Sequence, residues 1–351
     1  MKTIIQNINK DNINKEDLKL AADILKNGGL VAFPTETVYG LGGDGLREDA
    51  AKKIYTAKGR PSDNPLIIHI SNMNMLNKLV TDIPEKAKLL AKQFWPGPLT
   101  MIFPKSENVP MGTTGGLNTV AVRMPNHPVA LALIEQSGVC IAAPSANTSG
   151  RPSPTLASHV YEDMDGKIEM ILDGGKVGIG IESTIVDLTE DIPVILRPGS
   201  ITKAMLEEVI GTVEMDKAIL ATSPDKNLIP KAPGMKYKHY APKADLIIFE
   251  GEETSVVAEI NKRVLQQEKN GKKVAVIATK ESKEKYIAKE VVVIGSRKEE
   301  SEIANRLYEI LRNFDQMDID CIYSESFASN DLGQAIMNRL LKAAGYHIVY
   351  V

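Results

Sequence analysis

Seven short islands rich in Gly, Pro, Ser, Thr, Asn and basic residues interrupt the chain, each at the end of an apolar run. Hydroxyl, amide and cationic groups at strand ends can neutralise and orient a small anion. The set therefore predicts an anion-binding site assembled from several loops. In chain order the islands are FPTETVYGLG (33–42), KGRPSDNPL (58–66), PGPLT (96–100), RMP (123–125), PSANTSG (144–150), EST (182–184) and RPG (197–199).

Three basic residues in these islands are candidates for anion contacts. Lys58 and Arg60 stand two residues apart before a proline-bounded turn. On an extended segment such residues point the same way, so both charges can face one polyphosphate. Arg123 closes a strand, where its planar fork suits a carboxylate or a phosphate. A solvated charged turn and a salt bridge at the rim are the alternatives that remain open from these residues alone.

The neutral islands allow two interpretations. Ser145 and Asn147 in PSANTSG can form a nest for an anion, although an ordinary Ser/Asn-rich loop fits the composition equally well. His69 lies inside the apolar run LIIHI, where a lone histidine is more often a core residue than a ligand. The acids of the islands are Glu36 and Glu182. Without paired carboxylates or a nucleophile motif, the pattern favours catalysis by positioning and charge neutralisation.

A dinucleotide-binding loop is the alternative suggested by GLGGDG (40–45), which matches G-x-G-x-x-G after a predicted strand. A dinucleotide fold also needs an acidic residue about 20 positions later. The chain offers Lys58 and Arg60 there instead, so a nicotinamide-dependent dehydrogenase is disfavoured.

Bulk composition limits the class of protein. The chain has 351 residues, is 43% hydrophobic and carries a formal net charge of −3, as expected for a two-domain globular protein without a nonspecific nucleic-acid coat. A double-stranded RNA-binding module without catalysis stays open as the alternative function. Cys140 and Cys321 lie in apolar runs and are expected to be buried thiols. The chain has neither an apolar membrane span nor a signal peptide, which predicts a cytoplasmic protein without membrane contact.

The first 200 residues predict one α/β domain with a mixed sheet. Helices are expected at 15–27, 47–57 and 84–94, the first capped by Asn14 and stopped by Gly28 and Gly29. Strands are expected at 30–34, 66–70, 99–103, 119–124, 139–143, 168–172, 183–188 and 193–197.

The remainder predicts a connection and a second domain. Residues 211–243 include four prolines in a stretch without periodicity, so they are assigned to a linker. From 244 to 351 strands alternate with helices, which predicts a smaller, parallel, doubly wound sheet. We expect strands at 245–249, 273–279, 291–295, 320–325 and 347–351, with helices at 254–269, 299–314 and 331–344.

Taken in order, the islands resemble the YrdC-like threonylcarbamoyl-AMP synthase family. The likeness covers roughly residues 10–210, and the linker motif APGMKYKHYAP (232–242) with the α/β tail resembles the two-domain branch. The resemblance implies a YrdC-like domain (1–210) with a concave, positively lined cavity, and a C-terminal Rossmann-like domain (244–351). It implies that the linker (211–243), with Tyr237, His239 and Tyr240, folds over the site as a lid.

The resemblance also implies a reaction. L-Threonine and bicarbonate form a carbamate, which attacks the α-phosphate of ATP to give threonylcarbamoyl-AMP and pyrophosphate, with Mg²⁺ carried on the ATP phosphates. Partner transferase proteins then modify the adenosine beside the anticodon of tRNA, so that contact with tRNA is indirect.

Site roles carried over from the family fall into two groups. The glycines of FPTETVYGLG are assigned to a turn, and Lys58 and Arg60 also provide charge stabilisation. The groups implied to contact ATP are Lys58, Arg60, Asn64, Thr119, Ser145, Asn147, Ser153, Arg197 and Tyr237. Those implied to contact threonine or bicarbonate are Thr35, Thr37, His69, Arg123, the backbone of Ala143, and Ser183.

Overall fold

The structure, a computed structural model, describes residues 2–220, 232–233, 240–328 and 330–351. The chain divides into two compact units. Of the described residues, the first holds 2–149, 153–220 and 232–233, and the second holds 150–152, 240–328 and 330–351. Tyr237 and His239 of the predicted linker lie outside the described residues.

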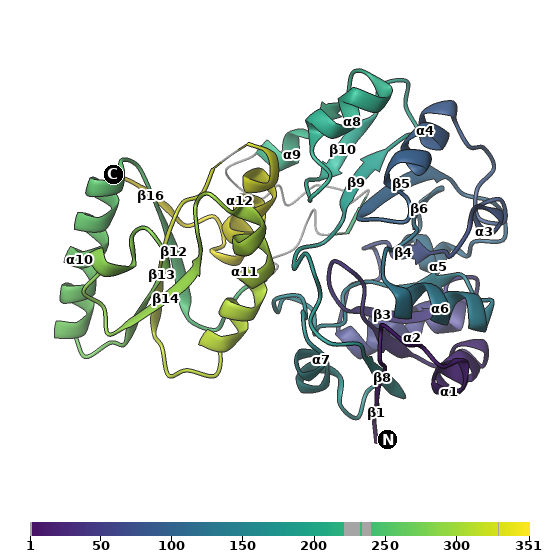
Figure 1. The fold of residues 1–351 in the computed structure, drawn as a ribbon, viewed down its shortest axis with the longest axis horizontal. Coiled ribbons are helices and arrows are strands. Elements are labelled where there is room, and N and C mark those ends of the chain that lie inside the picture. Colours follow the sequence, from purple (N-terminus) through teal and green to yellow (C-terminus); the bar gives the residue numbers. More distant parts are fainter. Residues whose placement is uncertain (1, 221–231, 234–239, 329) are drawn as a thin grey trace. The chain divides into compact units, whose positions relative to one another are not determined.

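The first unit is built on one mixed sheet (Figure 1), as its clustered apolar runs predict. The strand order is β1-β8-β2-β3-β7-β4-β6-β5-β9-β10-β11. Neighbours β4 and β6 run parallel, whereas β5 and β6 run antiparallel. The strands are β1 (Ile4–Asn7), β2 (Val31–Phe33), β3 (Gly40–Asp44), β4 (Ile67–His69), β5 (Leu99–Pro104), β6 (Thr119–Arg123), β7 (Ile141–Ala142), β8 (Met170–Asp173), β9 (Thr184–Asp187), β10 (Val194–Arg197) and β11 (Glu214–Met215).

Three helices of the first unit, α1, α2 and α4, begin and end within one residue of the predicted positions, whereas the other helices of this unit are not predicted from the sequence. Asn14 caps α1 by accepting the Glu16 N–H at 3.1 Å, and Gly28 follows the helix at φ +75°. Helix α1 packs against α6, and α4 packs against α8. The helices are α1 (Lys15–Lys26), α2 (Glu48–Lys58), α3 (Met73–Leu76), α4 (Glu85–Phe94), α5 (Met111–Thr114), α6 (Pro128–Ser137), α7 (Ala157–Met164), α8 (Lys203–Ile210) and α9 (Lys217–Leu220).

Strands β1 and β11 are not predicted by the sequence patterns, and neither is β3. Strand β1 pairs only with β8 among the described residues, and its side chains are largely exposed, so it lacks a strong apolar alternation. Strand β11 and helix α9 lie inside the range assigned to the linker, where β11 pairs with β10.

The glycines of FPTETVYGLG form strand β3, and their assignment to a turn is wrong. Gly40 and Gly42 pair antiparallel with Phe33 and Val31 of β2. A Cβ on Gly42 would lie 2.7 Å from Ile141 Cγ2 and 2.8 Å from Phe33 Cε1. Glycine is therefore needed here for close packing between neighbouring side chains, not for a left-handed turn.

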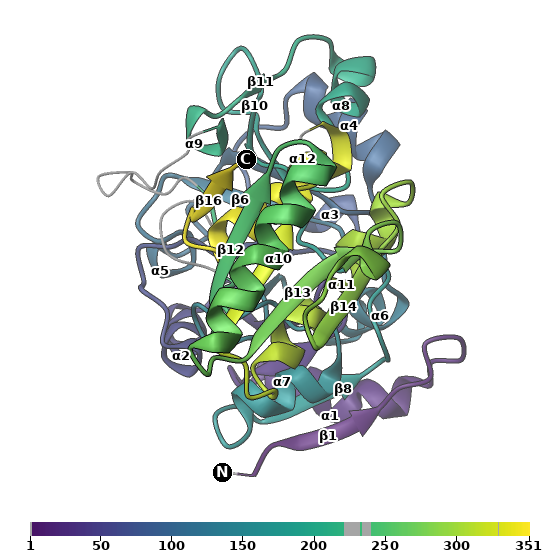
Figure 2. The same ribbon diagram turned by 90° about the vertical axis from the view of Figure 1, so that its left-hand side faces the viewer.

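The second unit is a parallel, doubly wound sheet, as predicted from its alternating pattern. Its order is β14-β13-β15-β12-β16, with α10 on one face and α11 and α12 on the other (Figures 1 and 2). Its elements are β12 (Asp245–Glu250), α10 (Glu253–Lys269), β13 (Val274–Thr279), the 3₁₀ helix η1 (Lys283–Lys285), β14 (Glu290–Gly295), α11 (Glu300–Phe314), β15 (Cys321–Glu325), α12 (Asp331–Ala343) and β16 (Ile348–Tyr350).

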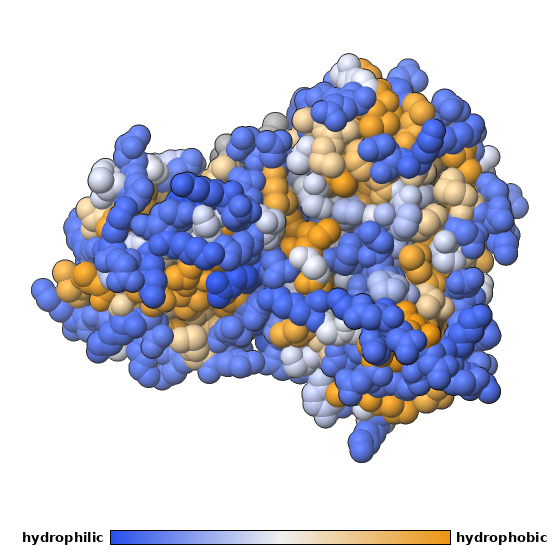
Figure 3. All heavy atoms as spheres, in the orientation of Figure 1, coloured by the Kyte–Doolittle hydropathy of each residue, from blue (hydrophilic) through white to orange (hydrophobic). Residues whose placement is uncertain are grey.

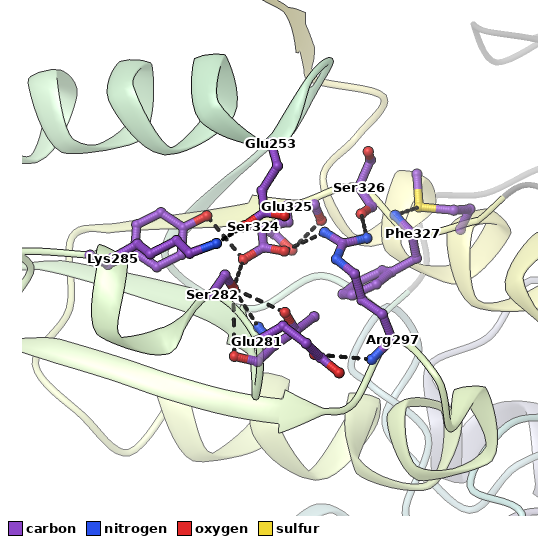
Figure 4. Close-up of polar contacts among 12 residues, drawn as sticks. Glu253, Glu281, Ser282, Lys285, Arg297, Ser324, Glu325, Ser326 and Phe327 are labelled. Carbon is purple, nitrogen blue, oxygen red and sulfur yellow. Dashed lines mark hydrogen bonds and ion pairs between the residues drawn. The ribbon is translucent and has the colours of Figure 1, made fainter.

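A polar network closes the carboxyl end of this sheet (Figure 4). Glu325, the last residue of β15, is buried and accepts hydrogen bonds from the hydroxyls of Ser282 and Tyr286 (3.0 Å for Tyr286) and from the Arg297 guanidinium. Arg297 also donates to the Ser326 carbonyl oxygen at 3.1 Å. Burial and the Glu325 carboxylate raise the pKa of the Tyr286 hydroxyl. The buried carboxylate is thus held by several donors, which offsets its desolvation.

A short segment of the loop between β7 and α7 is counted with the second unit. Within that unit the buried Arg312 of α11 donates to the Pro152 carbonyl oxygen through Nε at 3.0 Å and Nη2 at 2.7 Å. Arg151 pairs with Asp315 at 3.4 Å. The loop residues 150–152 are therefore anchored by side chains of α11 and the residue after it.

Apolar side chains fill the core of each unit. In the view of Figure 3 hydrophilic residues cover most of the surface, and apolar residues form small patches between them. Cys140 and Cys321 are buried free thiols, as expected, and burial raises the pKa of the Cys140 thiol to about 11. None of the helices in the described residues is long and apolar enough to span a membrane.

Gly42→Ala tests the close packing of β3. The added methyl would contact Ile141 and Phe33 below 3.0 Å, so we expect the first unit to be destabilised by about 1–3 kcal/mol. Urea unfolding followed by fluorescence reports on this unit, because the single tryptophan, Trp95, is buried in it. Gly178→Ala is the matched control, since its Cβ meets nothing closer than the Glu36 carbonyl oxygen at 3.8 Å. Equal midpoints for both variants would contradict this account of β3.

Candidate functional site

The parallel pairing of β4 and β6 places two of the predicted site residues side by side. Ile67 lies opposite Ala121 and His69 opposite Arg123, so His69 and Arg123 share one end of the strand pair. Thr119 begins β6, and at 3.3 Å per residue its Cα lies about 13 Å from that of Arg123. Thr119, predicted to contact ATP, and Arg123, predicted to contact threonine, thus lie at opposite ends of β6.

Arg123 is held at the end of β6 by the FPTETVYGLG loop. Its side chain is 4% exposed, and Nη1 donates to the Thr37 hydroxyl at 2.9 Å. Nε donates to the Gly97 carbonyl oxygen at 3.3 Å. The Thr37 hydroxyl in turn lies 2.9 Å from the hydroxyl of Thr35. Three of the predicted threonine-site residues therefore form one connected, buried chain of hydrogen bonds.

Glu36 is the carboxylate beside this arginine. Its Oε2 lies 2.7 Å from Arg123 Nη2, and its side chain is 13% exposed. Glu36 is one of the acidic residues of the islands, but the sequence pattern assigns it no role. Its position between Thr35 and Thr37, in the same loop that reaches Arg123, is the signal that could have found it.

A second buried arginine lies across the sheet on β10. Arg197 Nε donates to the Ser183 carbonyl oxygen at 3.0 Å, and Nη2 donates to the Ser183 hydroxyl at 3.1 Å. The Ser183 hydroxyl also lies 2.8 Å from that of Thr100 on β5. Since Thr100 is the register partner of Arg123, this group lies at the Arg123 end of the strands. Thr100 belongs to the PGPLT island but is not among the residues predicted to contact a substrate.

Lys58 joins α2 to the PSANTSG loop. Its side chain is buried, and Nζ donates to the backbone carbonyl oxygens of Ser145 (2.6 Å) and Asn147. The Ser145 hydroxyl donates to Asn147 Oδ1 at 2.5 Å. Gly40 of β3 forms an isolated bridge with Ser145, which ties this loop to the FPTETVYGLG segment. The structure therefore brings Lys58, Ser145 and Asn147 together. The expectation that Lys58 and Arg60 share an extended segment is wrong, because Lys58 ends helix α2 and Gly59 has left-handed backbone angles.

Arg60 and Asn64 stay together in the turn that follows α2. Arg60 donates to the backbone carbonyl oxygens of Asn64 (Nη2, 3.3 Å) and Pro65 (3.2 Å). The Tyr55 hydroxyl donates to the same Asn64 oxygen at 3.1 Å. Asn64 Oδ1 is buried without a hydrogen-bond partner among the described residues. Such an oxygen marks a position where a ligand donor fits.

His69 is a neutral core residue by its surroundings. It is 4% exposed, packs edge-on against Phe33, and has Nδ1 3.2 Å from the Ile67 carbonyl oxygen. Burial, followed by the positive charge of Arg123, lowers the pKa of His69 to about 3.

The Ala143 N–H already donates to the Ile67 carbonyl oxygen at 2.8 Å. A ligand contact at Ala143 would therefore use its carbonyl group or its methyl group.

Three further residues are predicted to contact ATP, namely Ser153, Thr119 and Tyr237. The Ser153 hydroxyl donates to Glu182 Oε1 at 2.6 Å, next to Ser183 in the chain. Thr119 stands at the amino end of β6, opposite Pro104. Tyr237 lies outside the described residues. Within the described ranges no cluster of three or more His, Cys, Asp or Glu side chains could hold a metal ion.

Comparisons with known proteins cover nearly the whole chain. A family model described as telomere recombination matches residues 23–199, and one described as threonylcarbamoyl-AMP synthase, C-terminal domain, matches residues 201–345. Curated threonylcarbamoyl-AMP synthases of Pyrococcus abyssi and Bacillus subtilis are 51% and 50% identical, over 99% and 96% of this chain and 100% and 95% of their own lengths. The crystal structure of Pyrococcus abyssi Sua5 complexed with L-threonine superposes with a TM-score of 0.93 at 51% identity, covering 99% of this chain and all of that one.

The burial of His69 predicts its titration. With its pKa lowered to about 3, the imidazole should stay neutral from pH 5 to 8, and NMR of ¹⁵N-labelled histidine should show no shift change there. In the unfolded chain the histidine pKa is about 6.5, so between pH 6.5 and 3 the unfolded state binds the extra proton. The stability associated with His69 is fully present above pH 6.5 and is lost as the pH falls.

Replacing His69 should make the free energy of unfolding depend less on pH below pH 6.5. In His69→Gln the slope of the unfolding free energy should fall by up to about 1.4 kcal/mol per pH unit between pH 4 and 6. Trp95 fluorescence during urea unfolding measures it. An imidazole that titrates near pH 6.5 in the folded wild-type protein would refute the buried, neutral assignment.

Proposed function

The chain belongs to the threonylcarbamoyl-AMP synthase family, and we propose that it joins L-threonine, bicarbonate and ATP into threonylcarbamoyl-AMP with release of pyrophosphate. Similarity over nearly the whole chain to relatives of that name supports the proposal. The site observation that carries it is the burial of Lys58, Arg123 and Arg197 among hydroxyl and carbonyl groups of the first unit. Buried cations are stabilised by anionic partners, and each of the three reactants is an anion or carries a carboxylate.

The arrangement supports two connected subsites. Arg123 with Thr37 and Thr35, together with Ser183, His69 and Ala143, is proposed to hold threonine and bicarbonate. Lys58, Arg60, Asn64, Ser145 and Asn147 are proposed to hold ATP, with Thr119, Ser153 and Arg197 as further contacts. Arg197 donates a hydrogen bond to Ser183, which belongs to the proposed threonine subsite. This position suits a contact between Arg197 and the α-phosphate of ATP, at which the two substrates react.

Catalysis is proposed to proceed by positioning and charge neutralisation. Threonine nitrogen bonds to the carbon of bicarbonate, and water leaves, which gives a carbamate. A carbamate oxygen then attacks the α-phosphorus of ATP, and the bond to pyrophosphate breaks. Both approaching groups are negative, so fixed cations and N–H groups lower the barrier by offsetting their repulsion. Mg²⁺ is proposed to enter as MgATP, because phosphate oxygens are its preferred ligands.

The product is a mixed anhydride intended for a second reaction. We propose that partner transferase proteins receive its threonylcarbamoyl group and attach it to the adenosine beside the tRNA anticodon. On this proposal the chain acts in the cytoplasm and needs no direct contact with tRNA.

Pyrophosphate release provides the test. Release from ATP should require both L-threonine and bicarbonate, and release independent of threonine would refute the proposal. RNA binding that weakens steeply with salt, without any pyrophosphate release, would instead favour a double-stranded RNA-binding module.

Lys58→Met and Arg60→Met test the phosphate role. Each removes a cation while keeping a side chain of similar length, and we expect turnover to fall by about 10²–10³-fold. Lys52→Met is the matched control, since Lys52 lies on the same helix but is exposed. Urea unfolding of all three variants separates lost chemistry from lost stability. Wild-type rates in the Lys58 and Arg60 variants would exclude them from phosphate binding.

A further inference from the structure

Glu36 is a partly buried carboxylate whose hydrogen-bonding capacity is unused. Its side chain is 13% exposed, and neither carboxylate oxygen has a hydrogen-bond partner among the described residues. Oε2 lies 2.7 Å from Arg123 Nη2, yet the N–H of that nitrogen is not aligned with the oxygen. The two groups therefore form an ion pair by proximity, while each retains an unmet donor or acceptor.

This arrangement costs stability. An unsatisfied buried polar group destabilises the folded state, and a charged group does so more strongly. The rest of the Arg123 fork is occupied, because Nη1 donates to Thr37 and Nε donates to Gly97. Nη2 is thus the nitrogen left to face Glu36 and any incoming group. Buried polar atoms left unsatisfied in this way often mark a site that a ligand completes.

The neighbouring histidine adds no further positive charge to Glu36. His127, at the start of α6, is 8% exposed, and burial lowers its pKa to about 4 even though the charge of Glu36 acts to raise it. Its Nδ1 likewise has no hydrogen-bond partner within the described part of the chain. At neutral pH the His127 imidazole is therefore uncharged.

An α-amino acid matches this pair, because it carries a carboxylate and an ammonium group on adjacent atoms. We propose that L-threonine inserts into the ion pair, with its carboxylate on Arg123 Nη2 and its ammonium on Glu36, and that Glu36 then accepts one ammonium proton. The inference rests on the proposed function, in which threonine is the amino-acid substrate. It assigns to Glu36 the proton transfer that the bond-forming step requires.

The proton balance requires such an acceptor. The ammonium gives one proton to the Glu36 carboxylate, which leaves a neutral amine and a carboxylic acid. The amine nitrogen bonds to the bicarbonate carbon as the C–OH bond breaks, and the second amine proton leaves with hydroxide as water. The Glu36 proton returns to solvent. Once the threonine carboxylate takes over Arg123, Glu36 is a desolvated carboxylate beside another carboxylate, which makes it a better proton acceptor.

Ligand binding to wild type and Glu36→Gln tests the ammonium contact. The probes are L-threonine and the matching 2,3-dihydroxybutanoate, in which a hydroxyl replaces the ammonium. Wild type should bind threonine roughly tenfold or more tightly than the hydroxy acid, and the variant should reduce this ratio below about threefold. Calorimetry measures both affinities without turnover. A ratio that is the same in the two proteins would overturn the proposal.

The pH profile tests the proton transfer. Without the acceptor, Glu36→Gln depends on threonine that is already neutral, so its pyrophosphate release should rise about tenfold per pH unit from pH 7 towards 9, more steeply than that of wild type. Parallel profiles would overturn the role as proton acceptor. Glu135→Gln, an exposed acid on α6, serves as the control and should match wild type throughout.

The two proposals fail in different ways. If wild type releases no pyrophosphate in response to threonine, the proposed function fails, while the binding ratio still reports on Glu36. If release depends on threonine but Glu36→Gln keeps the wild-type ratio and profile, only the inference about Glu36 fails. Urea unfolding of the variant, followed by Trp95, shows whether the first unit remains folded.

Discussion

The burial of Arg123 is the constraint around which the first unit is arranged. A guanidinium that is 4% exposed must be held by groups brought to it, because water cannot solvate it. Those groups come from segments far apart in the chain: Thr37 and Glu36 from the loop between β2 and β3, and Gly97 from the turn before β5. The loop, the turn and the end of β6 are therefore fixed relative to one another by one charge.

Two glutamates, the buried Glu325 and the partly buried Glu36, show how differently a carboxylate can be accommodated. Glu325 in the second unit is surrounded by donors from Ser282, Tyr286 and Arg297, so its charge is matched and its role is structural. Glu36 in the first unit has an arginine at 2.7 Å but no hydrogen bond from the described residues. The first arrangement stabilises a sheet edge, whereas the second leaves capacity for a substrate group.

The pairing of the strands brings islands that are far apart in the sequence to one end of the sheet. Parallel pairing of β4 with β6 puts His69 beside Arg123, and antiparallel pairing of β5 with β6 puts Thr100 beside Arg123 as well. Gly42 lets Phe33 and Ile141 approach across β3, which seats the loop that carries Glu36. The residues that contact Arg123 and the closely packed glycines thus share one decapeptide, because the loop that reaches Arg123 continues directly into strand β3.

The sequence by itself determined the two α/β units, the parallel order of the second sheet, and the islands that carry Lys58, Arg123 and Ser183. Periodicity and residue type act locally, so these features can be read from a single chain. The tertiary structure decided that GLGGD is a strand, because its pairing with β7 and the crowding by Ile141 come from residues distant in sequence. It also decided that Glu36 faces Arg123, since the charge of a carboxylate is visible in the sequence but its partner and its desolvation arise only when the chain folds.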